Sequence, residues 1–364
     1  MSNLQHEFHQ SLGALFTEVN SAEMVADYGD PGAEHAALRQ TAGVLDFSNR
    51  GRLCLTGTDR VRYLHGQVTN DLKKLTPGTG AYAAVTTAKG RMEGDLNILL
   101  LADEILLDFE PGQTEKILPR LGKFIVADDV QIVDAAPYYG LLSVQGPGAA
   151  AVIVALGLCE QDALSARPFD SIKITDPNLG DLYLANLPRL GTSGFDVYAP
   201  TAALGMVADK LIAAAVQAGG RACGWTAFET ARIEAGFPRY GADMDETNIP
   251  LECGLESRAV SYSKGCYIGQ EVINRIHSIG HVTRELRGLR LADDLLALPT
   301  RGDKLFQSGR EVGFVTSAVK SPALNANIAL SYVRREANQV GSELILRTAA
   351  GESAVKIVEL PFVK

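Results

Sequence analysis

The sequence has few cysteines, and none of them are paired at metal-binding spacing. Its 364 residues contain five: Cys54, Cys159, Cys223, Cys253 and Cys266, with no C-x-x-C among them. An odd number of widely spaced cysteines argues against a disulfide framework and against a four-cysteine zinc or iron–sulfur site. The cysteine pattern therefore predicts a protein of the reducing cytoplasm.

Long apolar runs and an excess of basic charge are also absent. No window of about 18 residues is free of charged and polar breaks, so no membrane-spanning helix and no membrane partner are expected. The first twenty residues lack a basic stretch followed by an apolar core, which argues against a secretory signal. Net charge is -9, from 34 basic and 43 acidic residues. This balance disfavours a general nucleic-acid-binding surface but leaves a local basic patch open.

Length and composition predict two or three globular domains, with 46% hydrophobic and 21% charged residues. Between residues 52 and 145, strands alternate with helices in an order typical of a ferredoxin-like α+β layer with helices on one face. From residue 286 onward, short strands separated by turns predict a small all-β barrel or sandwich. The first fifty residues favour a helix followed by a strand, and residues 237–290 show little periodicity.

The most unusual segment is KGCYIGQE, residues 264–271. If a helix begins near Gly269, its dipole and Lys264 favour the thiolate form of Cys266, which makes the sulfur nucleophilic or able to bind a metal. The alternative is that Cys266 is a small buried residue in a glycine-rich turn. Spacing alone favours the buried alternative.

Residues 258–290 are basic although the chain is acidic. Six basic side chains against two acidic ones give a segment charge of six minus two, +4, against -9 for the whole chain. Such a segment favours an anionic ligand or partner, which includes carboxylates, phosphates and RNA. The alternative is a solvated surface whose neighbours cancel the charge. The basic residues are Arg258, Lys264, Arg275, Arg284, Arg287 and Arg290, and the acidic ones are Glu271 and Glu285.

Two further pairs have spacing that suits a site. His277 and His281 stand four residues apart, but Gly280 disfavours a helix there and no third ligand is close in sequence, so no metal site is expected. Glu93 and Asp95 share one face of a predicted strand. They can orient a polar ligand or form a solvated strand end.

Five stretches taken together resemble one known family. They are LDFSNRGRLCLTGTDRVRYLHGQVTNDL (45–72), SVQGPGA (143–149), GFDVYAP (194–200), RIEAGFPRYGADMDETNIPLE (232–252) and KGCYIGQEV (264–272). The chain resembles the aminomethyltransferase-like (GcvT-like) folate-binding proteins over nearly its whole length. Within this family it resembles the YgfZ branch, whose mark is K-G-C-Y-x-G-Q-E.

The resemblance implies an α+β, GcvT-like folate-binding fold of three domains around a central channel. Residues 1–285 form the folate-binding region, with a ferredoxin-like subdomain at about 52–145, and residues 286–364 form a C-terminal β-barrel. Tetrahydrofolate, including polyglutamylated folate, is the implied cofactor. The implied role is support of the assembly or repair of iron–sulfur enzymes, including those that thiolate tRNA, so client enzymes and tRNA are the implied partners.

Departures from the family pattern suggest which branch the chain belongs to. The aminomethyltransferase segment G-G-x-x-D-D-L corresponds to GRMEGDL (90–96), so its first, catalytic aspartate falls on Gly94 and only Asp95 remains. The acid that grips the pterin falls on Asp196, and an arginine of the enzyme falls on Phe228. We therefore expect altered folate binding through Asp196 and no glycine-cleavage activity.

The sequence thus predicts a tetrahydrofolate-binding protein that supports iron–sulfur enzymes. One alternative is a folate-dependent one-carbon transferase, and another is a non-catalytic scaffold for a client protein or tRNA. The predicted functional thiol is Cys266 with Lys264 beside it, and the predicted folate contacts are Asp196, Asp95, Arg232, Arg258 and Phe228.

Overall fold

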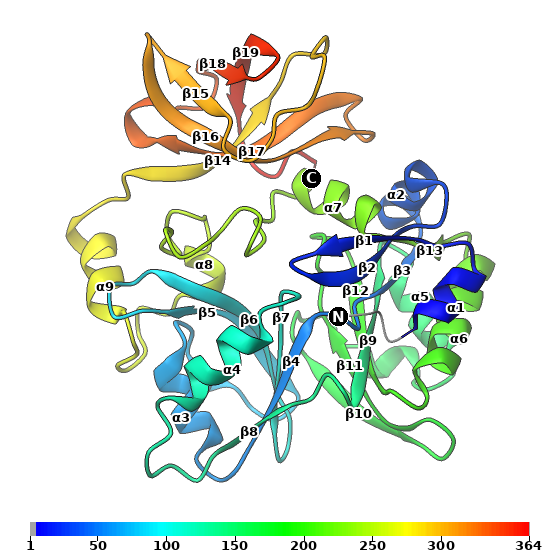
Figure 1. Ribbon diagram of the computed structural model, residues 1–364. Helices are drawn as coiled ribbons and strands as arrows, with labels where there is room; N and C mark the ends of the chain where they lie inside the picture. Colours follow the sequence, from blue (N-terminus) through cyan, green and yellow to red (C-terminus); the bar gives the residue numbers. More distant parts are fainter. Residues whose placement is uncertain (1–4, 364) are drawn as a thin grey trace. The chain divides into compact units, whose positions relative to one another are not determined.

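The computed structural model describes residues 5–363 (Figure 1). The described chain forms two compact units. The first contains the residues up to Ala83 and Gly94–Phe228, and the second contains Ala84–Glu93 and the residues from Glu229 onward. Each unit has its own hydrophobic core. Within the described range, no helix is long and apolar enough to cross a membrane.

A five-stranded sheet with two helices forms one half of the first unit. In spatial order its strands are β5 (Thr79–Thr86), β6 (Met92–Leu100), β7 (Ile105–Phe109), β4 (Gly51–Thr56) and β8 (Gln131–Asp134). The helices are α3 (Arg60–Gln67) and α4 (Thr114–Gly122), and the hydroxyl of Tyr63 in α3 donates to the Leu121 carbonyl of α4. The predicted alternation of strands and helices is confirmed.

The two faces of β6 differ in character. Leu96 and Ile98 are fully buried, whereas Asp95 and Asn97 are half-buried. Side chains alternate across a strand, so the apolar pair faces the core and the polar pair faces the opposite side of the sheet. Ile117 of α4 lies within 2.7 Å of where a Cβ on Gly94 would stand, so α4 covers the core face.

The other half of the first unit is a six-stranded sheet. Its strands in order are β10 (Ser171–Asp176), β11 (Gly180–Asn186), β12 (Gly194–Pro200), β9 (Tyr139–Gln145), β3 (Gly43–Asp46) and β13 (Arg221–Ala222), of which only the last pair is parallel. The helices α5 (Ala149–Ala155) and α6 (Leu204–Gln217) bury Val152, Val207 and Leu211 against it. β9 lies in this sheet, so the five-stranded sheet ends at Asp134.

The first fifty residues contain more strand than predicted. α1 (His6–Ser11) is followed by a hairpin of β1 (Leu15–Val19) and β2 (Ala22–Asp27), and then by α2 (Pro31–Gln40). The hairpin turn consists of Asn20 and Ser21, with φ of 49° and 64°. A two-residue turn with both φ positive usually contains glycine. Without that signal, the prediction of a helix followed by a strand missed this hairpin and is wrong here.

The second unit contains a closed barrel of six strands. In order they are β14 (Arg284–Arg290), β17 (Ala326–Arg334), β16 (Arg310–Ser321), β15 (Lys304–Gln307), β18 (Glu343–Thr348) and β19 (Gly351–Val358). Leu344 and Leu346 point inward while their neighbours in β18 are exposed, the alternation expected of a barrel strand. The α+β fold with a C-terminal barrel is confirmed, and the sandwich alternative is wrong.

Residues 237–283 hold two helices, α8 (Glu256–Ala259) and α9 (Gln270–Ile279). α9 begins after Gly269, whose φ is 92°, as the glycine pattern suggested. α7 (Trp225–Glu234) precedes this segment, and the boundary between the two units falls within it. The predicted domain ranges 1–285 and 286–364 stay a prediction.

A buried ion pair fastens this segment to the barrel within the second unit. Arg232 is 2% exposed and pairs with Asp243, which is 1% exposed. The Asp243 carboxylate also accepts hydrogen bonds from the hydroxyls of Thr316 at 2.5 Å and Ser317 at 2.7 Å, both in β16. The family-like block 232–252 therefore has a structural function in this unit.

Replacing Asp243 with alanine leaves the Arg232 guanidinium buried without its main counter-charge. We expect the free energy of unfolding to fall by about 3–5 kcal/mol, measured by urea denaturation. Glu352→Ala breaks the exposed Arg347–Glu352 pair and should change it by less than about 1 kcal/mol. Equal effects of the two substitutions would contradict the structural assignment.

Candidate functional site

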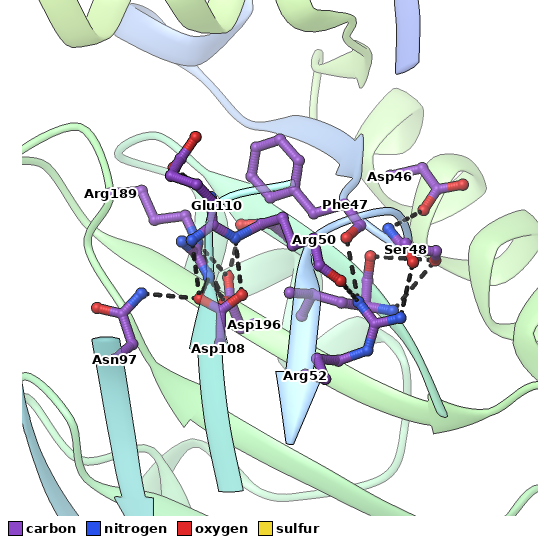
Figure 2. Close-up of polar contacts among 12 residues, drawn as sticks. Asp46, Phe47, Ser48, Arg50, Arg52, Asn97, Asp108, Glu110, Arg189 and Asp196 are labelled. Carbon is purple, nitrogen blue, oxygen red and sulfur yellow. Dashed lines mark hydrogen bonds and ion pairs between the residues drawn. The ribbon is translucent and has the colours of Figure 1, made fainter. Parts of the chain in front are cut away.

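The polar centre of the first unit is built around Arg189, which follows β11. Its side chain is 9% exposed, and Nη2 donates to Asp108 Oδ2 at 2.6 Å and to Asp196 Oδ2 at 2.5 Å. Asp108 lies in β7 of the five-stranded sheet and Asp196 in β12 of the six-stranded sheet. One guanidinium therefore joins the two sheets (Figure 2).

Asp108 is the most heavily bonded carboxylate of this cluster. It accepts hydrogen bonds from Arg50 Nε at 2.7 Å and from Asn97 Nδ2 at 2.7 Å, in addition to Arg189. Burial alone would raise the pKa of Asp108, but the Arg189 and Arg50 guanidinium groups lower it well below its usual range. Asp108 is therefore ionised at neutral pH.

Asp196, the predicted pterin anchor, is fully buried. Its Oδ1 accepts from the Ser143 hydroxyl at 2.7 Å, and both oxygens accept from Arg189. Burial raises the pKa of Asp196, and the Arg189 guanidinium opposes that rise. A pterin can reach this carboxylate only by displacing Arg189 or Ser143, so the anchoring role stays a prediction and the observed role is to hold Arg189.

Residues 47–50 present two side chains to this cluster, and Arg52 holds them in place. Arg52 is fully buried and donates to the backbone carbonyls of Phe47, Ser48 and Arg50. Figure 2 shows this fan of hydrogen bonds beside the Arg189 cluster. Since the carbonyls of the segment are satisfied from within, it needs no ligand to keep its shape.

An aromatic group lies against the arginines. The Arg189 guanidinium is 5.4 Å from the Phe47 ring centroid, and the Phe228 ring is 5.0 Å from the same ring. Trp225 completes the group, 5.3 Å from Phe228. Phe228 was predicted to mark an altered folate contact. It is buried in this aromatic group, where it contacts Phe47.

Asp95 is the acid of this region with an open oxygen. Its Oδ2 accepts from the Tyr82 hydroxyl at 2.6 Å, and Oδ1 has no hydrogen-bond partner among the described residues. Burial raises the pKa of Asp95 to about 6, the Glu110 carboxylate adds to the rise, and the hydrogen bond from Tyr82 opposes it. A half-buried carboxyl group of this kind can exchange a proton near neutral pH.

Gly94 lies on the face of β6 that packs against α4, and not on the face of the polar cluster. A Cβ there would lie 2.7 Å from Ile117 Cδ1, on the face of β6 that packs against α4. Asp95 and Asn97 occupy the other face, and Asn97 bonds to Asp108. An aspartate at position 94 would therefore not reach the polar cluster. The inference that Gly94 removes the reactive acid is corrected, because the carboxylate that faces the site is Asp95.

In the second unit, Cys266 lies four residues before α9 and is exposed. Lys264 is buried, and its Nζ lies 4.8 Å from the Tyr267 ring centroid. The lysine therefore packs on an aromatic ring and is not a free surface charge. The alternative that Cys266 is a buried packing residue is not supported.

Two other predicted folate contacts have protein partners in this unit. Arg232 is committed to Asp243 and Glu229. The Arg258 guanidinium lies 4.4 Å from the Phe237 ring centroid. Folate binding by either residue stays a prediction.

The second unit has a cavity of about 1000 Å³ with a basic lining. Arg284 lies 5.0 Å from the ring centroid of Tyr332, and exposed Arg334 and Arg335 lie at its rim. Of the six basic residues in segment 258–290, Arg284 alone is part of this lining. Arg287 and Arg290 pair with Glu285 and Asp293, so neighbouring acids cancel part of the segment's charge.

His277 and His281 do not form the metal pair considered from their spacing. His277 is in α9, which ends at Ile279 before His281. His277 Nδ1 lies 2.6 Å from Glu256 Oε1, and its ring stacks on Tyr262 at 3.7 Å between centroids. Within residues 5–363, no cluster of three or more His, Cys, Asp or Glu side chains is arranged to hold a metal.

Comparison with known proteins identifies the family. A family model described as the GCVT N-terminal domain matches residues 5–264, and the glycine cleavage T-protein C-terminal barrel domain matches residues 284–364. The chain belongs to the glycine cleavage T-protein family. The finer resemblance to one branch of the family rests on the sequence motif alone.

Relatives of this T-protein family cover almost the whole chain. The aminomethyltransferase of Geobacillus thermodenitrificans is 30% identical over 357 residues, 97% of this chain and 95% of its own length. The aminomethyltransferase of Bacillus subtilis is 28% identical over 359 residues, 98% of each chain. The crystal structure of glycine cleavage system aminomethyltransferase T from Bartonella henselae has a TM-score of 0.90 at 23% identity and covers 100% of this chain and 98% of its own. The last comparison establishes the shared T-protein fold.

The five cysteines of this T-protein family member should differ sharply in reactivity. Cys266 is exposed, whereas burial raises the pKa of Cys54 to about 12 and raises the pKa of Cys159, Cys223 and Cys253. We expect iodoacetamide to label Cys266 first at pH 7.5, as read by peptide mass spectrometry. Faster labelling of any other cysteine would show that the loop 264–269 shields the sulfur.

Proposed function

We propose that this protein is a tetrahydrofolate-dependent one-carbon transferase of the aminomethyltransferase type. The observation that carries the proposal is Asp95, an acid with one open oxygen on the polar face of β6. Its strand segment is the counterpart of the family's reactive segment. One-carbon transfer, the alternative function in the sequence analysis, is now favoured over support of iron–sulfur enzymes. The reason is that Asp95, next to Gly94, supplies the carboxylate that the sequence comparison treated as missing.

The residues of the first unit fit the reactive amine of tetrahydrofolate better than the edge of its pterin ring. Asp95 Oδ1 is open to a ligand N–H, as the reactive amine requires. The Asp196 carboxylate, which was predicted to bind the pterin edge, already accepts hydrogen bonds from Arg189 and Ser143. When bound, tetrahydrofolate supplies the amine that takes up the one-carbon unit. We therefore assign Asp95 to the amine and leave Asp196 as a support of Arg189.

In this proposal the protein does three things around the reacting amine. Ionised Asp95 accepts the proton that the amine loses as its nitrogen bonds to the aminomethyl carbon and the bond from that carbon to its leaving group breaks. Tyr82 holds the carboxylate through its hydroxyl, which fixes the direction of Oδ1. Arg50 and Arg189 keep Asp108 ionised and joined to both sheets, so the floor of the site is rigid.

The cavity of the second unit is the proposed site for an anionic ligand. Arg334 and Arg335 have no side-chain partner within the described range and stand at its rim with Arg284. Arginine side chains suit carboxylates, such as those of polyglutamylated folate. An anionic ligand is thus still proposed, but four of the five basic side chains that line the cavity, Arg91, Lys304, Arg334 and Arg335, lie outside segment 258–290.

The Asp95→Asn variant tests the proposal directly. With an aminomethylated carrier protein and tetrahydrofolate as substrates, we expect the transfer rate to fall by about 10²–10⁴-fold, because the amide cannot accept the proton. The rate of the wild type should be high above pH 6 and fall below it, since protonation of a group whose pKa is about 6 removes the base. The variant should lack this acid limb.

Asp103→Asn is the matched control, since it removes an exposed carboxylate from the turn of the same hairpin. It should retain wild-type transfer and the wild-type pH profile. Absence of any transfer by the wild-type protein would overturn the proposed function. Wild-type activity in Asp95→Asn would overturn the assignment of Asp95.

A second candidate function rests on Cys266, the exposed thiol of the KGCYIGQE segment. We propose that a member of the YgfZ branch of this family would use this thiol to support iron–sulfur enzymes, including tRNA-thiolating ones, in the cytoplasm. In that function folate binding is retained and client enzymes or tRNA are the partners. The exposure of Cys266 supports this candidate, and the similarity to aminomethyltransferases favours the first.

Cys266→Ala separates the two functions. The change removes one exposed sulfur atom and should leave stability and one-carbon transfer at the wild-type level. If the second function operates, the variant should fail to restore the activity of an iron–sulfur enzyme in cells that lack the protein, whereas Cys159→Ala should restore it. Full restoration by Cys266→Ala would remove the second candidate.

A further inference from the structure

A second carboxylate, that of Glu110, follows the strand paired with β6. In the antiparallel pair β6–β7, Asn97 lies opposite Asp108, Ile98 opposite Leu107 and Leu99 opposite Leu106. β7 ends at Phe109, so Glu110 is the first residue beyond it. Continuing the register by two residues brings Glu110 to the side of the sheet that carries Asp95 and the Asn97–Asp108 pair. Arg50 bonds to both Asp108 and Glu110, which holds these two acids on one side.

Glu110 and Asp95 have unequal partners. Glu110 is 6% exposed, and its Oε1 accepts from Arg50 Nη1 at 2.7 Å. Asp95 receives a neutral hydroxyl from Tyr82. A guanidinium stabilises the ionised form of its partner far more than a phenol does. Of two neighbouring carboxylates, the one without a paired cation keeps its proton to a higher pH.

We propose that Glu110 is a positioning residue that holds a fixed negative charge near Asp95 and so decides the pH at which Asp95 takes up a proton. This inference rests on the proposed function in one respect only, namely that Asp95 takes its proton from the reacting amine. Glu110 itself touches no reacting atom. It acts through the protonation state of Asp95, and Arg50 keeps it charged.

The charged and titratable groups around Asp95 either favour or disfavour its ionised form. Tyr82 in β5 and Arg50, which precedes β4, favour the ionised form of Asp95, whereas Asp108 in β7 and Glu110 disfavour it. Asp108 pairs with two guanidinium groups, those of Arg50 and Arg189, whereas Glu110 pairs with Arg50, which it shares with Asp108. Glu110 is therefore the anion whose removal should change the titration of Asp95 most.

The test is a titration of the carboxyl groups in the protein without substrate, by carbon NMR with ¹³C-labelled aspartate and glutamate. In the wild type, the pKa of Glu110 should lie below that of Asp95. In Glu110→Gln, which keeps an oxygen for Arg50 but loses the charge, the pKa of Asp95 should fall by about one unit or more. Glu110→Asp keeps the charge and should keep the pKa of Asp95 raised.

Glu104→Gln is the control, because Glu104 lies at the far end of the same hairpin, bonded to Tyr183 and Cys54. It should leave the titration of Asp95 unchanged. The inference is overturned if Glu110 titrates above Asp95 in the wild type, or if Glu110→Gln leaves the pKa of Asp95 where it was. Since the wild-type order is decisive, a variant that fails to fold does not block the test.

This measurement is independent of the proposed function. A lowered pKa of Asp95 in Glu110→Gln together with no transfer activity in the wild type would support the inference and overturn the proposed function. If the wild type does transfer a one-carbon unit, the acid limb of its pH profile should move down in Glu110→Gln by the same amount as the NMR titration. An unmoved limb would show that Glu110 does not act on the reaction through Asp95.

Discussion

The buried bridge from Asp108 through Arg189 to Asp196 is the interaction on which the first unit depends. Each carboxylate belongs to a different sheet, and Arg189 pairs with both, while Arg50 also pairs with Asp108. Removing Arg189 would leave Asp196 buried without the cation that pairs with it, at a cost far above that of any surface pair. Because the bridge also holds Asn97 through Asp108, it fixes the face of β6 on which Asp95 stands.

The elements with strong periodicity were predictable from sequence. The barrel strands and the alternation of strands and helices between residues 52 and 134 follow apolar patterns of period two and 3.6, which packing reinforces. The hairpin of β1 and β2 escaped because its turn uses Asn20 and Ser21 in place of glycine. α9 was foreseen from Gly269 alone, since its own sequence is half polar.

The candidate site was predictable only in part, for a physical reason. Asp95 and Asp196 could be found by motif, but the motif carries no information on which face a side chain takes. Gly94 and Asp95 differ by one residue and therefore by a whole face of the sheet. Arg50, Arg189 and Glu110 were missed because they act as partners of acids from other strands, and their pairing exists only after folding.

The two units carry different kinds of reactive group. The first holds a carboxyl group poised near neutral pH, and the second holds an exposed thiol and a basic cavity. The family-like block 232–252, the clearest mark of the superfamily, contributes packing through Arg232 and Asp243. The most recognisable sequence block of the family thus stabilises the fold, whereas the proposed reactive carboxylate, Asp95, lies in the less distinctive segment 90–96.

A structure of the protein with bound tetrahydrofolate tests the central claim most directly. The quantity to measure is the distance from Asp95 Oδ1 to the nearest ring or bridge nitrogen of the folate. A hydrogen-bond distance of about 2.6–3.2 Å, with the Arg189 bridge intact, is the predicted result. Folate bound with Asp95 left facing solvent, or with its pterin on Asp196 in place of Arg189, would contradict the account.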